Sequence, residues 1–293
     1  MLARRTFMAG AAGAALLAAA PRPQGKQAAF GGERLRDAVA ALERESRGRL
    51  GVGLLDKANG ARFGWRADER FGMASTFKFL AAAATLYRVD RGIERLGRRI
   101  PVRRSDIVAY SPAMEKRVGG SASIAELCEA TIALSDNAAG NLLLPPLGGP
   151  AGLTRFLRAA GDPVTRLDRS EPRMNDVQGR DIRDTTTPMA MADDLDRFLL
   201  GDILRPQSRG LLLDWMASAV TGPRRIRAGV PADWLVAHKT GTSGGGGFND
   251  VALLRPPGRA PLLLSIYLAE TPLEGAAAEA ILAGVTRAVV REA

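Results

Sequence analysis

Residues 75–89 read STFKFLAAAATLYRV, and the stretch opens with the short cluster Ser75-Thr76-Phe77-Lys78. From Phe77 to Val89 apolar residues occupy most of the circumference that a helix would have. A helix that is apolar nearly all round belongs inside a protein core. The stretch therefore predicts a central buried helix with Ser75 and Lys78 in its first turn.

The middle of the chain, from about residue 75 to 217, is predicted to be rich in helices, and the segments on either side of it are predicted to form strands. Two strands joined as a hairpin are predicted near the N-terminus and three consecutive strands near the C-terminus: Leu50–Leu55, Ala61–Trp65, Trp234–Thr240, Asp250–Arg255 and Leu262–Leu268. Arg34–Ser46 and Ala276–Arg291 read as helices. We therefore expect an α/β fold, a sheet built from both ends of the chain with a helical insertion between them.

The composition allows a sizeable core without disulfides or metal. The chain has 293 residues, of which 46% are hydrophobic, enough for one large or two smaller domains. Its single cysteine, Cys128, cannot form an intramolecular disulfide and is expected to be a buried, inert thiol in a helix over Ile124–Leu134. One histidine cannot build a zinc site, and we expect no metal and no cofactor.

A net charge of +10, mostly from arginine, suggests nucleic-acid binding, above all where five arginines cluster in Arg95–Arg104. However, no aromatic residues are interleaved there for base stacking, and no groove-reading motif is present. A solvated basic surface explains the charge better, so no nucleic-acid partner is expected.

The first 29 residues resemble an export signal and a linker. Arg4-Arg5 is a twin-arginine pattern, and the apolar run Ala9–Ala20 follows it. That run is too short to span a bilayer, and no cysteine follows it to carry a lipid. We expect cleavage of a twin-arginine signal, no stable membrane anchor, and a periplasmic or secreted protein.

Ser75 and Lys78 form a possible nucleophile and base. They are three residues apart, so a helix places both side chains on one face. The helix N-terminus adds free N–H groups and a positive dipole end, which favour oxyanion character. A partly desolvated amine has a lowered pKa and can accept the serine proton. The pair alone is weak evidence, because Ser-x-x-Lys also arises by chance.

Two further clusters have an ordinary structural explanation and a chemical one. Ser135-Asp136-Asn137 follows a predicted helix, where such residues are favoured in turns. Lys239-Thr240-Gly241 ends a predicted strand, where it is either a solvent-exposed terminus or a binding site for a carboxylate. Because all three clusters occur together and in this order, we favour one site for acyl transfer.

The segment Arg169–Asp184 is polar, aperiodic and of a length that suits a compact Ω-loop, which an Arg169–Asp184 ion pair could close. Within it, Glu171 and Asn175 could hold a water against an acylated serine. Glu171 could also be an ordinary surface carboxylate, but its neighbours argue against that.

The three clusters together resemble those of the class A serine β-lactamases. Five further stretches match: Tyr110-Ser111-Pro112, Ala138–Asn141, Asp168–Pro172, Asp184–Pro188 and Arg225–Ala228. The resemblance implies a β-lactamase/transpeptidase-like α+β sandwich, in which helices flank an antiparallel sheet and the active site lies between it and an all-helical domain. The expected domains are 30–65 with 218–293, and 66–217, which includes the Ω-loop 169–184.

The implied function is hydrolysis of the β-lactam amide of penicillins and cephalosporins by a monomer, with resistance to these antibiotics as the result. Ser75 attacks the lactam carbonyl and gives its proton to Lys78 or, through water, to Glu171. The resemblance also implies a cis Glu171–Pro172 bond. It assigns the oxyanion hole to the backbone N–H groups of Ser75 and Thr242.

The remaining roles implied by the resemblance are proton transfer, substrate binding and water activation. Ser135 protonates the lactam nitrogen, and Glu171 with Asn175 activates the deacylating water. Substrate contacts are assigned to Lys239, Thr240, Thr242 and Arg225 for the carboxylate, to Asn137 for the acyl amide and to Tyr110 for the cleft wall.

Two rival functions remain, and Glu171 disfavours the first. A transpeptidase or carboxypeptidase shares the three clusters but lacks the water-holding carboxylate. A β-lactam sensor would acylate without release, and would normally carry a membrane span or a second domain.

Three features bear on substrate range and on departures from the family. Thr242 and Arg225 resemble residues of relatives that accept cephalosporins or carbapenems, and this resemblance implies a wide substrate range. Gly244–Gly247 is expected to leave the strand edge mobile enough for bulky acyl groups. His238 stands where relatives often carry Asp. We expect it to point away from the site in a structural or surface role, and tuning of Lys239 is the alternative.

Overall fold

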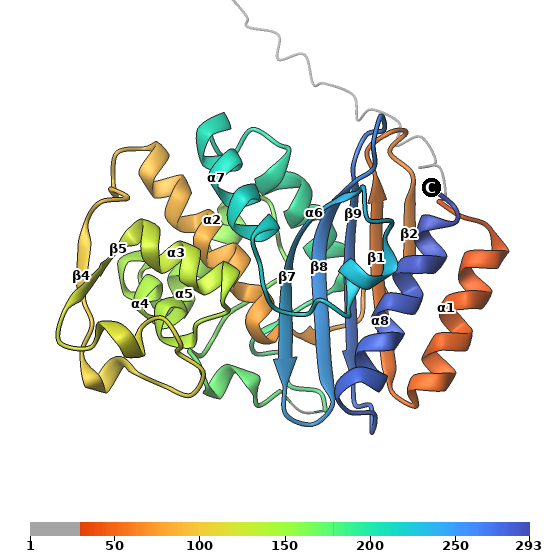
Figure 1. The fold of residues 1–293 in the computed structure, drawn as a ribbon, viewed down its shortest axis with the longest axis horizontal. Helices are drawn as coiled ribbons and strands as arrows, with labels where there is room; N and C mark the ends of the chain where they lie inside the picture. Colours follow the sequence, from red (N-terminus) through yellow and green to blue (C-terminus); the bar gives the residue numbers. More distant parts are fainter. Residues whose placement is uncertain (1–29, 178) are drawn as a thin grey trace, which may run out of the picture.

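The computed structural model describes residues 30–177 and 179–293, so the twin-arginine segment lies outside the described residues. Its largest sheet is antiparallel, with the strand order β2-β1-β9-β8-β7 (Figure 1). The strands are β1 (Arg49–Asp56), β2 (Arg62–Trp65), β7 (Leu235–Ser243), β8 (Gly247–Arg255) and β9 (Leu262–Ala269). The prediction of one sheet built from both ends of the chain is confirmed.

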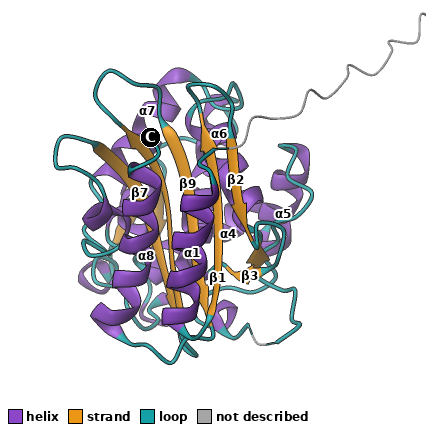
Figure 2. Ribbon diagram, turned by 90° about the vertical axis from the view of Figure 1, so that its right-hand side faces the viewer, coloured by secondary structure: helices purple, strands orange, loops and turns teal. Residues whose placement is uncertain are grey.

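Helices cover both faces of this sheet. The terminal helices α1 (Glu33–Ser46) and α8 (Gly275–Val290) lie side by side on one face (Figure 2). Helix α6 (Pro188–Leu199) packs on the other face, against β1 and β9. Because side chains alternate along a strand, β1, β7, β8 and β9 each contribute to two cores, one on each side of the sheet.

The helical half lies beside β7 and surrounds one central helix, α2 (Phe77–Asp90), whose residues Phe77–Leu86 are all buried. Around it stand α3 (Ile124–Ala133), α4 (Asn137–Leu147), α5 (Gly149–Ala159) and α7 (Pro206–Ala217). The predicted buried helix is therefore present. Ser75 precedes α2, in the 3₁₀ turn η1 (Ala74–Thr76) that leads into it.

Short elements connect these parts. The small sheets pair β3 (Phe71–Gly72) with β6 (Thr185–Thr186), and β4 (Arg99–Pro101) with β5 (Ser121–Ser123). Further 3₁₀ turns are η2 (Arg104–Asp106), η3 (Glu115–Arg117), η4 (Arg173–Asn175) and η5 (Ile226–Gly229). No helix in 30–177 or 179–293 is both long and apolar enough to cross a membrane.

The sheet is joined directly to the turn that carries Ser75. The Tyr267 hydroxyl on β9 lies 3.1 Å from Thr76 Oγ1, and Asn249 Nδ2 on β8 donates to the carbonyls of Gly72 and Met73, at 2.9 and 3.1 Å. Since all these groups are largely buried, their hydrogen bonds fix η1 against the sheet.

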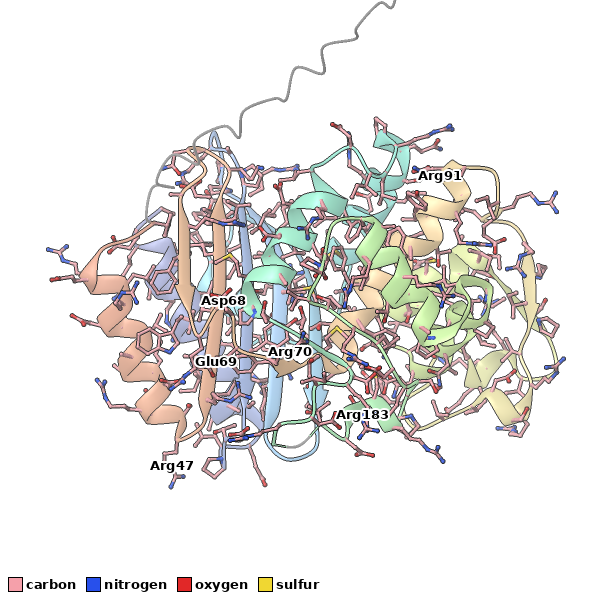
Figure 3. All side chains as sticks on the ribbon, turned by 180° about the vertical axis from the view of Figure 1, so that it is seen from behind. Arg47, Asp68, Glu69, Arg70, Arg91 and Arg183 are labelled. Carbon is pink, nitrogen blue, oxygen red and sulfur yellow. The ribbon has the colours of Figure 1, made fainter. Side chains whose placement is uncertain are left out.

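Charged side chains are spread over both halves of the molecule (Figure 3). Arg47 projects at the sheet end and Arg91 at the helical end. In the predicted basic cluster, Arg98 is paired with Glu94 and Arg99 lies 3.7 Å from Glu126. Carboxylates therefore offset part of the charge of that cluster.

Cys128 is fully buried on α3, and burial raises the pKa of its thiol. Because the thiolate is the reactive form, this confirms the prediction of a buried, inert cysteine.

An aromatic cluster holds α2, α5 and α6 together and yields a stability prediction. Phe198 stacks on Phe156 with 5.5 Å between ring centroids, and meets Phe79 edge-on at 6.1 Å. Phe198→Ala removes this fully buried ring, so the free energy of unfolding should fall by about 3–5 kcal/mol in urea titration. Ile93→Ala at an exposed turn is the control and should change it by less than about 0.5 kcal/mol. Equal losses in both variants would contradict this account of the core.

Candidate active site

A cleft of about 440 Å³ opens between the two halves of the molecule. It lies where η1, α4, the Ω-loop and β7 meet, and it collects residues from six separate parts of the sequence. Its lining comprises Ser75, Tyr110, Ser135, Asn137, Glu171, Asn175, Val220, Thr221, Gly222, Arg225, Thr240 and Thr242. Lys78 and Lys239 are fully buried and touch lining residues. All the residues predicted from the sequence to act in the site are therefore brought together.

Ser75 is within reach of a base on either side. Lys78 Nζ donates to Ser75 Oγ at 2.9 Å, and the Ser75 hydroxyl donates to Glu171 Oε1 at 3.3 Å. The turn η1 and the first turn of α2 set the first distance, and the Ω-loop sets the second. A serine placed in this way can lose its proton to either neighbour.

Lys78 sits in a dense shell of acceptors. Its Nζ donates to the Ser135 carbonyl at 2.7 Å and to Asn137 Oδ1 at 2.5 Å, and lies 3.4 Å from Glu171 Oε1. Burial lowers the pKa of Lys78 to about 8, against the opposing effect of the Glu171 charge. The amine is therefore poised to exchange a proton near neutral pH.

Ser135-Asp136-Asn137 is both a helix-terminal turn and a part of the site. Asp136 caps α4 by accepting the Ala139 N–H at 2.9 Å, and its other oxygen accepts the Ala113 and Met114 N–H groups. Ser135 adopts a φ of 57°, in the left-handed region that non-glycine residues rarely occupy. Such strain is typical of functional sites.

Lys239 on β7 completes a chain of two amines and a hydroxyl. Its Nζ donates to Ser135 Oγ at 2.9 Å, and Lys78 Nζ lies 3.4 Å from the same oxygen. Burial, and next the positive charge of Lys78, hold the pKa of Lys239 well below its usual range. Ser135 therefore lies between two closely spaced amines and can pass a proton.

Gly241 allows β7 to approach the turn that carries Ser75. A Cβ at this position would lie 2.8 Å from the Met73 carbonyl and 3.2 Å from Ser75 N. Only glycine permits this distance. The backbone of the strand around Thr242 is thus brought beside the Ser75 N–H.

The Ω-loop is closed by the ion pair that the sequence suggested. Arg169 Nε donates to Asp184 Oδ2 at 2.5 Å, and Asp184 Oδ1 accepts the backbone N–H groups of Asp168 and Arg169 at 2.7 and 2.8 Å. Asp184 is fully buried, so each of these bonds is made out of water. The Glu171–Pro172 peptide bond is cis.

Glu171 is held at both its backbone and its side chain. Asn175 Nδ2 donates to Glu171 Oε2 at 2.6 Å, which leaves Oε1 toward Ser75 and Lys78. The Asn141 amide both accepts the Glu171 N–H and donates to the Glu171 carbonyl, each at 2.9 Å. Glu171 is only 4% exposed. The interpretation of Glu171 as an ordinary surface carboxylate is therefore wrong.

Sequence reasoning missed the positioning roles of Asn141, Asp136 and Thr221. Asn141 orients Glu171, Asp136 fixes the segment that precedes Met114, and Thr221 Oγ1 lies 2.7 Å from Thr240 Oγ1. The only signal was that Asn141 falls in a stretch matching the family. Its partner lies 30 residues away.

Arg225 lines the cleft and also acts on it through hydrogen bonds to the backbone and side chains of neighbouring residues. Its guanidinium donates to the carbonyls of Gly241 and Asn249 at 2.8 and 2.9 Å, to Thr242 Oγ1 at 2.7 Å and to Glu279 Oε1 at 3.2 Å. With most of its donors engaged, Arg225 orients the Thr242 hydroxyl and adds positive charge behind it.

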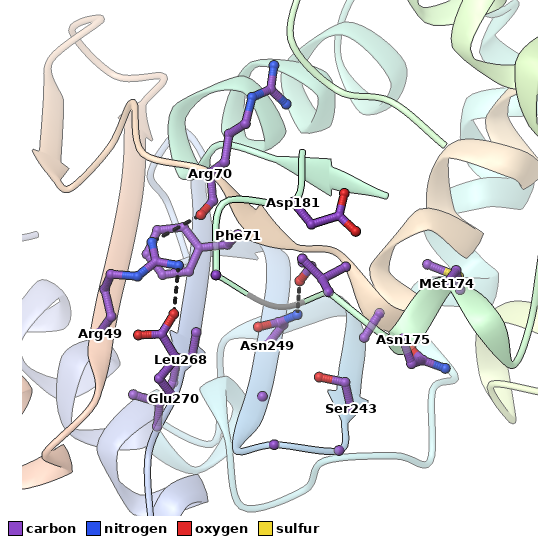
Figure 4. Close-up of a pocket in the computed structure, with 18 of the residues that line it drawn as sticks. Arg49, Arg70, Phe71, Met174, Asn175, Asp181, Ser243, Asn249, Leu268 and Glu270 are labelled. Atoms are coloured by element: carbon purple, nitrogen blue, oxygen red, sulfur yellow. Dashed lines mark hydrogen bonds and ion pairs between the residues drawn. The ribbon is translucent and has the colours of Figure 1, made fainter. Parts of the chain in front are cut away.

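A second cavity of about 370 Å³ lies between the Ω-loop and the β7–β8 hairpin (Figure 4). Asn175 lines both this cavity and the cleft. One hairpin glycine has a steric reason, because a Cβ on Gly246 would lie 2.1 Å from the Thr271 carbonyl, whereas a Cβ on Gly244 or Gly245 would meet nothing within 4 Å. The structure therefore explains Gly246 by close packing, and the expected mobility of the strand edge stays a prediction.

His238 lies on the face of β7 opposite Lys239, as alternation predicts. It is fully buried, with Nδ1 3.0 Å from Asp250 Oδ1. Among residues 30–177 and 179–293 no group of three metal-ligating side chains occurs.

Comparison with known proteins agrees with this geometry. Residues 34–293 match the model of the Beta-lactamase enzyme family. The chain is 47% identical to Beta-lactamase FAR-1 of Nocardia farcinica, and the match covers 86% of this chain and 80% of that protein. It is 43% identical to Beta-lactamase CTX-M-8 of Citrobacter amalonaticus, and that match covers 86% of both proteins. A solved structure of an ancestral (GNCA) class A β-lactamase matches with a TM-score of 0.87 and 56% identity, over 88% of this chain and 99% of that one.

The surroundings of Lys78 predict how it titrates. In protein with ¹³C-labelled lysine, the Lys78 Cε resonance should titrate near pH 8. Glu171→Gln removes the negative charge that raises the pKa of Lys78, so the midpoint should move to lower pH. The resonance is assigned by its loss in Lys78→Arg. An unchanged or higher midpoint in Glu171→Gln would contradict the assigned coupling.

Proposed function

The chain belongs to the class A β-lactamases, and from that premise we propose that it hydrolyses the β-lactam amide of penicillins and cephalosporins through an acyl-enzyme on Ser75. Resistance to these antibiotics is the consequence for the host. The observation that carries the proposal is the position of Ser75 Oγ, 2.9 Å from Lys78 Nζ and 3.3 Å from Glu171 Oε1, with Glu171 itself bound by Asn175.

Acylation begins when Ser75 Oγ attacks the lactam carbonyl carbon and its proton passes to one of two bases. Lys78 in its neutral form accepts the proton directly, and Glu171 accepts it directly or through a water. Both lie within reach, and the lowered pKa of Lys78 supports its use as a base near neutral pH. The reaction needs no other group to generate the nucleophile.

The negative charge that develops on the carbonyl oxygen meets the backbone N–H groups of Ser75 and Thr242. Close packing of Gly241 on η1 supports this oxyanion hole, because it brings the two backbone segments together. One such donor contributes about 10²–10³-fold to the rate, on the order of 3 kcal/mol.

Opening of the lactam ring requires a proton on its nitrogen, and Ser135 is the donor. Its hydroxyl accepts from Lys239 at 2.9 Å and lies 3.4 Å from Lys78 Nζ. A proton given to the nitrogen by Ser135 is replaced from the neighbouring ammonium group. Lys78 thereby returns the proton that it took from Ser75.

The substrate carboxylate is bound by Lys239, Thr240 and Thr242, with Arg225 acting through the Thr242 hydroxyl. Asn137 hydrogen-bonds the acyl amide. Tyr110, which is 59% exposed at the cleft, supplies an apolar wall. These contacts orient the lactam carbonyl toward Ser75.

Deacylation distinguishes this site from that of a transpeptidase or a sensor. Glu171, whose Oε1 faces Ser75, and Asn175 frame the position of a water that attacks the ester on Ser75, while Glu171 takes the proton of that water. We also propose that the protein acts as a monomer outside the cytoplasm after twin-arginine export, which Arg4-Arg5 and the following apolar run support.

Glu171→Gln tests the assigned deacylation. The variant should still acylate with benzylpenicillin but release product at least about 10²-fold more slowly, because no group takes the proton from the attacking water. Mass spectrometry should find the adduct on Ser75 in the variant and unmodified protein in the wild type once the lactam absorbance is lost. Turnover by Glu171→Gln at the wild-type rate would refute the role of Glu171. A lasting adduct on the wild type would move the protein to the binding class.

The cavity between the Ω-loop and the hairpin supports a wide acyl-group range, including oxyimino-cephalosporins, because it adjoins the cleft at Asn175. We expect measurable kcat/KM on cefotaxime. Thr242→Ala removes the hydroxyl that Arg225 orients and should reduce kcat/KM about tenfold, the effect of losing about 1–2 kcal/mol of hydrogen bonding. Absence of any cefotaxime hydrolysis by the wild type would contradict the wide range.

A further inference from the structure

An open groove of about 640 Å³ lies on the helical half of the molecule, and we call it the α2–α4 groove. It is formed by the last turn of α2, the segment from Ile93 to Asp106 and the C-terminal part of α4. The apolar part of its lining comprises Ile93, Ile100, Pro101, Leu142, Pro145 and Pro146. The α2–α4 groove shares no lining residue with the cleft, so acyl transfer does not account for it.

Arginine dominates the chain segment beside this groove. Residues 88–104 hold seven arginines and only two acidic side chains. In the described part of the chain, two of the seven form an ion pair, Arg98 with Glu94 and Arg99 with Glu126. This end of the molecule therefore carries positive charge that the protein does not compensate, and such a surface attracts anions. The arginines without a carboxylate partner in residues 30–177 and 179–293 are Arg88, Arg91, Arg95, Arg103 and Arg104.

The two carboxylates that line the α2–α4 groove are already engaged. Glu94 binds the Arg98 guanidinium, and Asp106 accepts the backbone N–H of Arg103 at 2.8 Å. Neither carboxylate forms an ion pair with Arg88 or with the guanidinium of Arg103, although all four residues line the groove. The groove is thus open to an anion from outside the protein.

Arg88 directs part of this charge into the groove. Its Nε is buried and has no hydrogen-bond partner among the residues that the structure describes, and its terminal nitrogens, which solvent reaches, have none either. Since polar groups at this depth are normally hydrogen-bonded, the guanidinium is suited to an acceptor that arrives in the groove. The planar fork of arginine matches two oxygens of a phosphate.

An exposed isoleucine stands at the edge of the groove. Ile93 is 58% exposed and follows Gly92, whose φ of 70° lets the chain turn sharply after α2. The Ile93 N–H donates to the Arg88 carbonyl at 2.9 Å, so the turn is fixed by a hydrogen bond. A single exposed apolar residue is ordinary. This one continues an apolar lining and lies between Arg91 and Arg95 in the sequence, which makes the surface amphipathic.

Apolar side chains surrounded by arginines without carboxylate partners match the chemistry of an anionic bilayer surface. There, phosphate groups lie next to the first part of the acyl chains, so arginine and isoleucine side chains at the same depth meet both. Nucleic acid matches less well, because residues 88–104 contain no aromatic side chain for base stacking. A nucleic acid would also leave Ile93 without an apolar partner.

We propose that the α2–α4 groove and the turn at Ile93 form a docking surface for anionic phospholipids, through which the folded protein binds reversibly to a membrane surface. The guanidinium groups of Arg88, Arg95 and Arg103 contact lipid phosphates, and Ile93 enters the boundary of the acyl chains. Strand β4, which belongs to this segment, lies at the opposite end of the molecule from α1 (Figure 1). The cleft shares no residue with the groove, so docked protein keeps its cleft open.

Vesicle sedimentation tests the need for charge. The wild type should bind vesicles that contain phosphatidylglycerol, should bind pure phosphatidylcholine far less, and should be released by salt, which screens the charges. Arg95→Gln/Arg103→Gln should weaken binding about 25-fold, since one arginine near an anionic surface contributes about fivefold. Arg34→Gln/Arg44→Gln is the matched control, because it removes two exposed positive charges from α1. It should weaken binding less than about threefold. Equal losses in the two double variants would overturn the proposal.

Ile93→Ala tests the apolar contact. It should weaken binding to the anionic vesicles about tenfold, because most of an apolar side chain is lost from the bilayer boundary. In solution, kcat/KM for benzylpenicillin should be unchanged in Ile93→Ala and in Arg95→Gln/Arg103→Gln, which shows that both variants are folded. Binding of the wild type to duplex DNA as tightly as to anionic vesicles, with no effect of Ile93→Ala on either, would overturn the assignment to lipid.

A local probe separates this surface from any contribution of residues 1–29. Cys128 is fully buried, so a thiol-reactive fluorophore on Ile93→Cys labels the turn alone. Its emission should shift to the blue with phosphatidylglycerol vesicles and should be quenched by brominated acyl chains. The same fluorophore on Arg34→Cys, at the other end of the molecule, should show neither effect. No response from the label at Ile93→Cys, or an equal response from Arg34→Cys, would overturn the proposal.

Discussion

Two ammonium groups buried around one serine hydroxyl are the constraint on which the rest of the site depends. Lys78 and Lys239 are fully buried and both approach Ser135 Oγ, although neighbouring positive charges repel each other in a medium of low polarity. Several carbonyl and carboxylate oxygens offset that repulsion, and they come from the turn before α4, from α4, from β7 and from the Ω-loop. The two halves of the molecule must therefore be docked for the charges to be compensated. Docking in turn gives both amines lowered pKa values, and with them their use in moving protons.

Much of the fold was predictable because the spacing of apolar residues along the sequence indicates which helices and strands are buried. Phe77–Val89 could only be a core helix, and the strand segments at both ends of the chain were found within a few residues. The 3₁₀ turn at Ser75 was not, because it arises where β7 packs against Met73 and Ser75 through Gly241. Strand ends also shifted. For example, β8 begins at Gly247, three residues before the predicted start, since its pairing with β7 continues to the hairpin.

Prediction of the site had a similar limit. Motif spacing and family resemblance identified the side chains that take part in the chemistry. They did not identify the hydrogen bonds that hold those side chains in position. The contacts of Asn141 with Glu171, of Asp136 with the segment before Met114, and of His238 with Asp250 all join positions far apart in the chain or depend on strand register. The hydrogen bonding of Arg225 was equally invisible, because its acceptors are supplied by the folded strands β7 and β8 and by Glu279 on α8.

The closure of the Ω-loop has a consequence for how the two half-reactions could be separated. Ser75, Lys78 and Ser135 are held by the docked core, whereas Glu171 and Asn175 stand on a segment whose ends are joined by Asp184 and its partners. Local opening of that segment, which demands far less free energy than global unfolding, would remove the hydrolytic water while leaving the nucleophile intact. The protein would then be acylated by the antibiotic on Ser75 without releasing it. Acylation and deacylation thus depend on different segments of one chain. An inhibitor that holds the Ω-loop open would block deacylation and leave acylation intact.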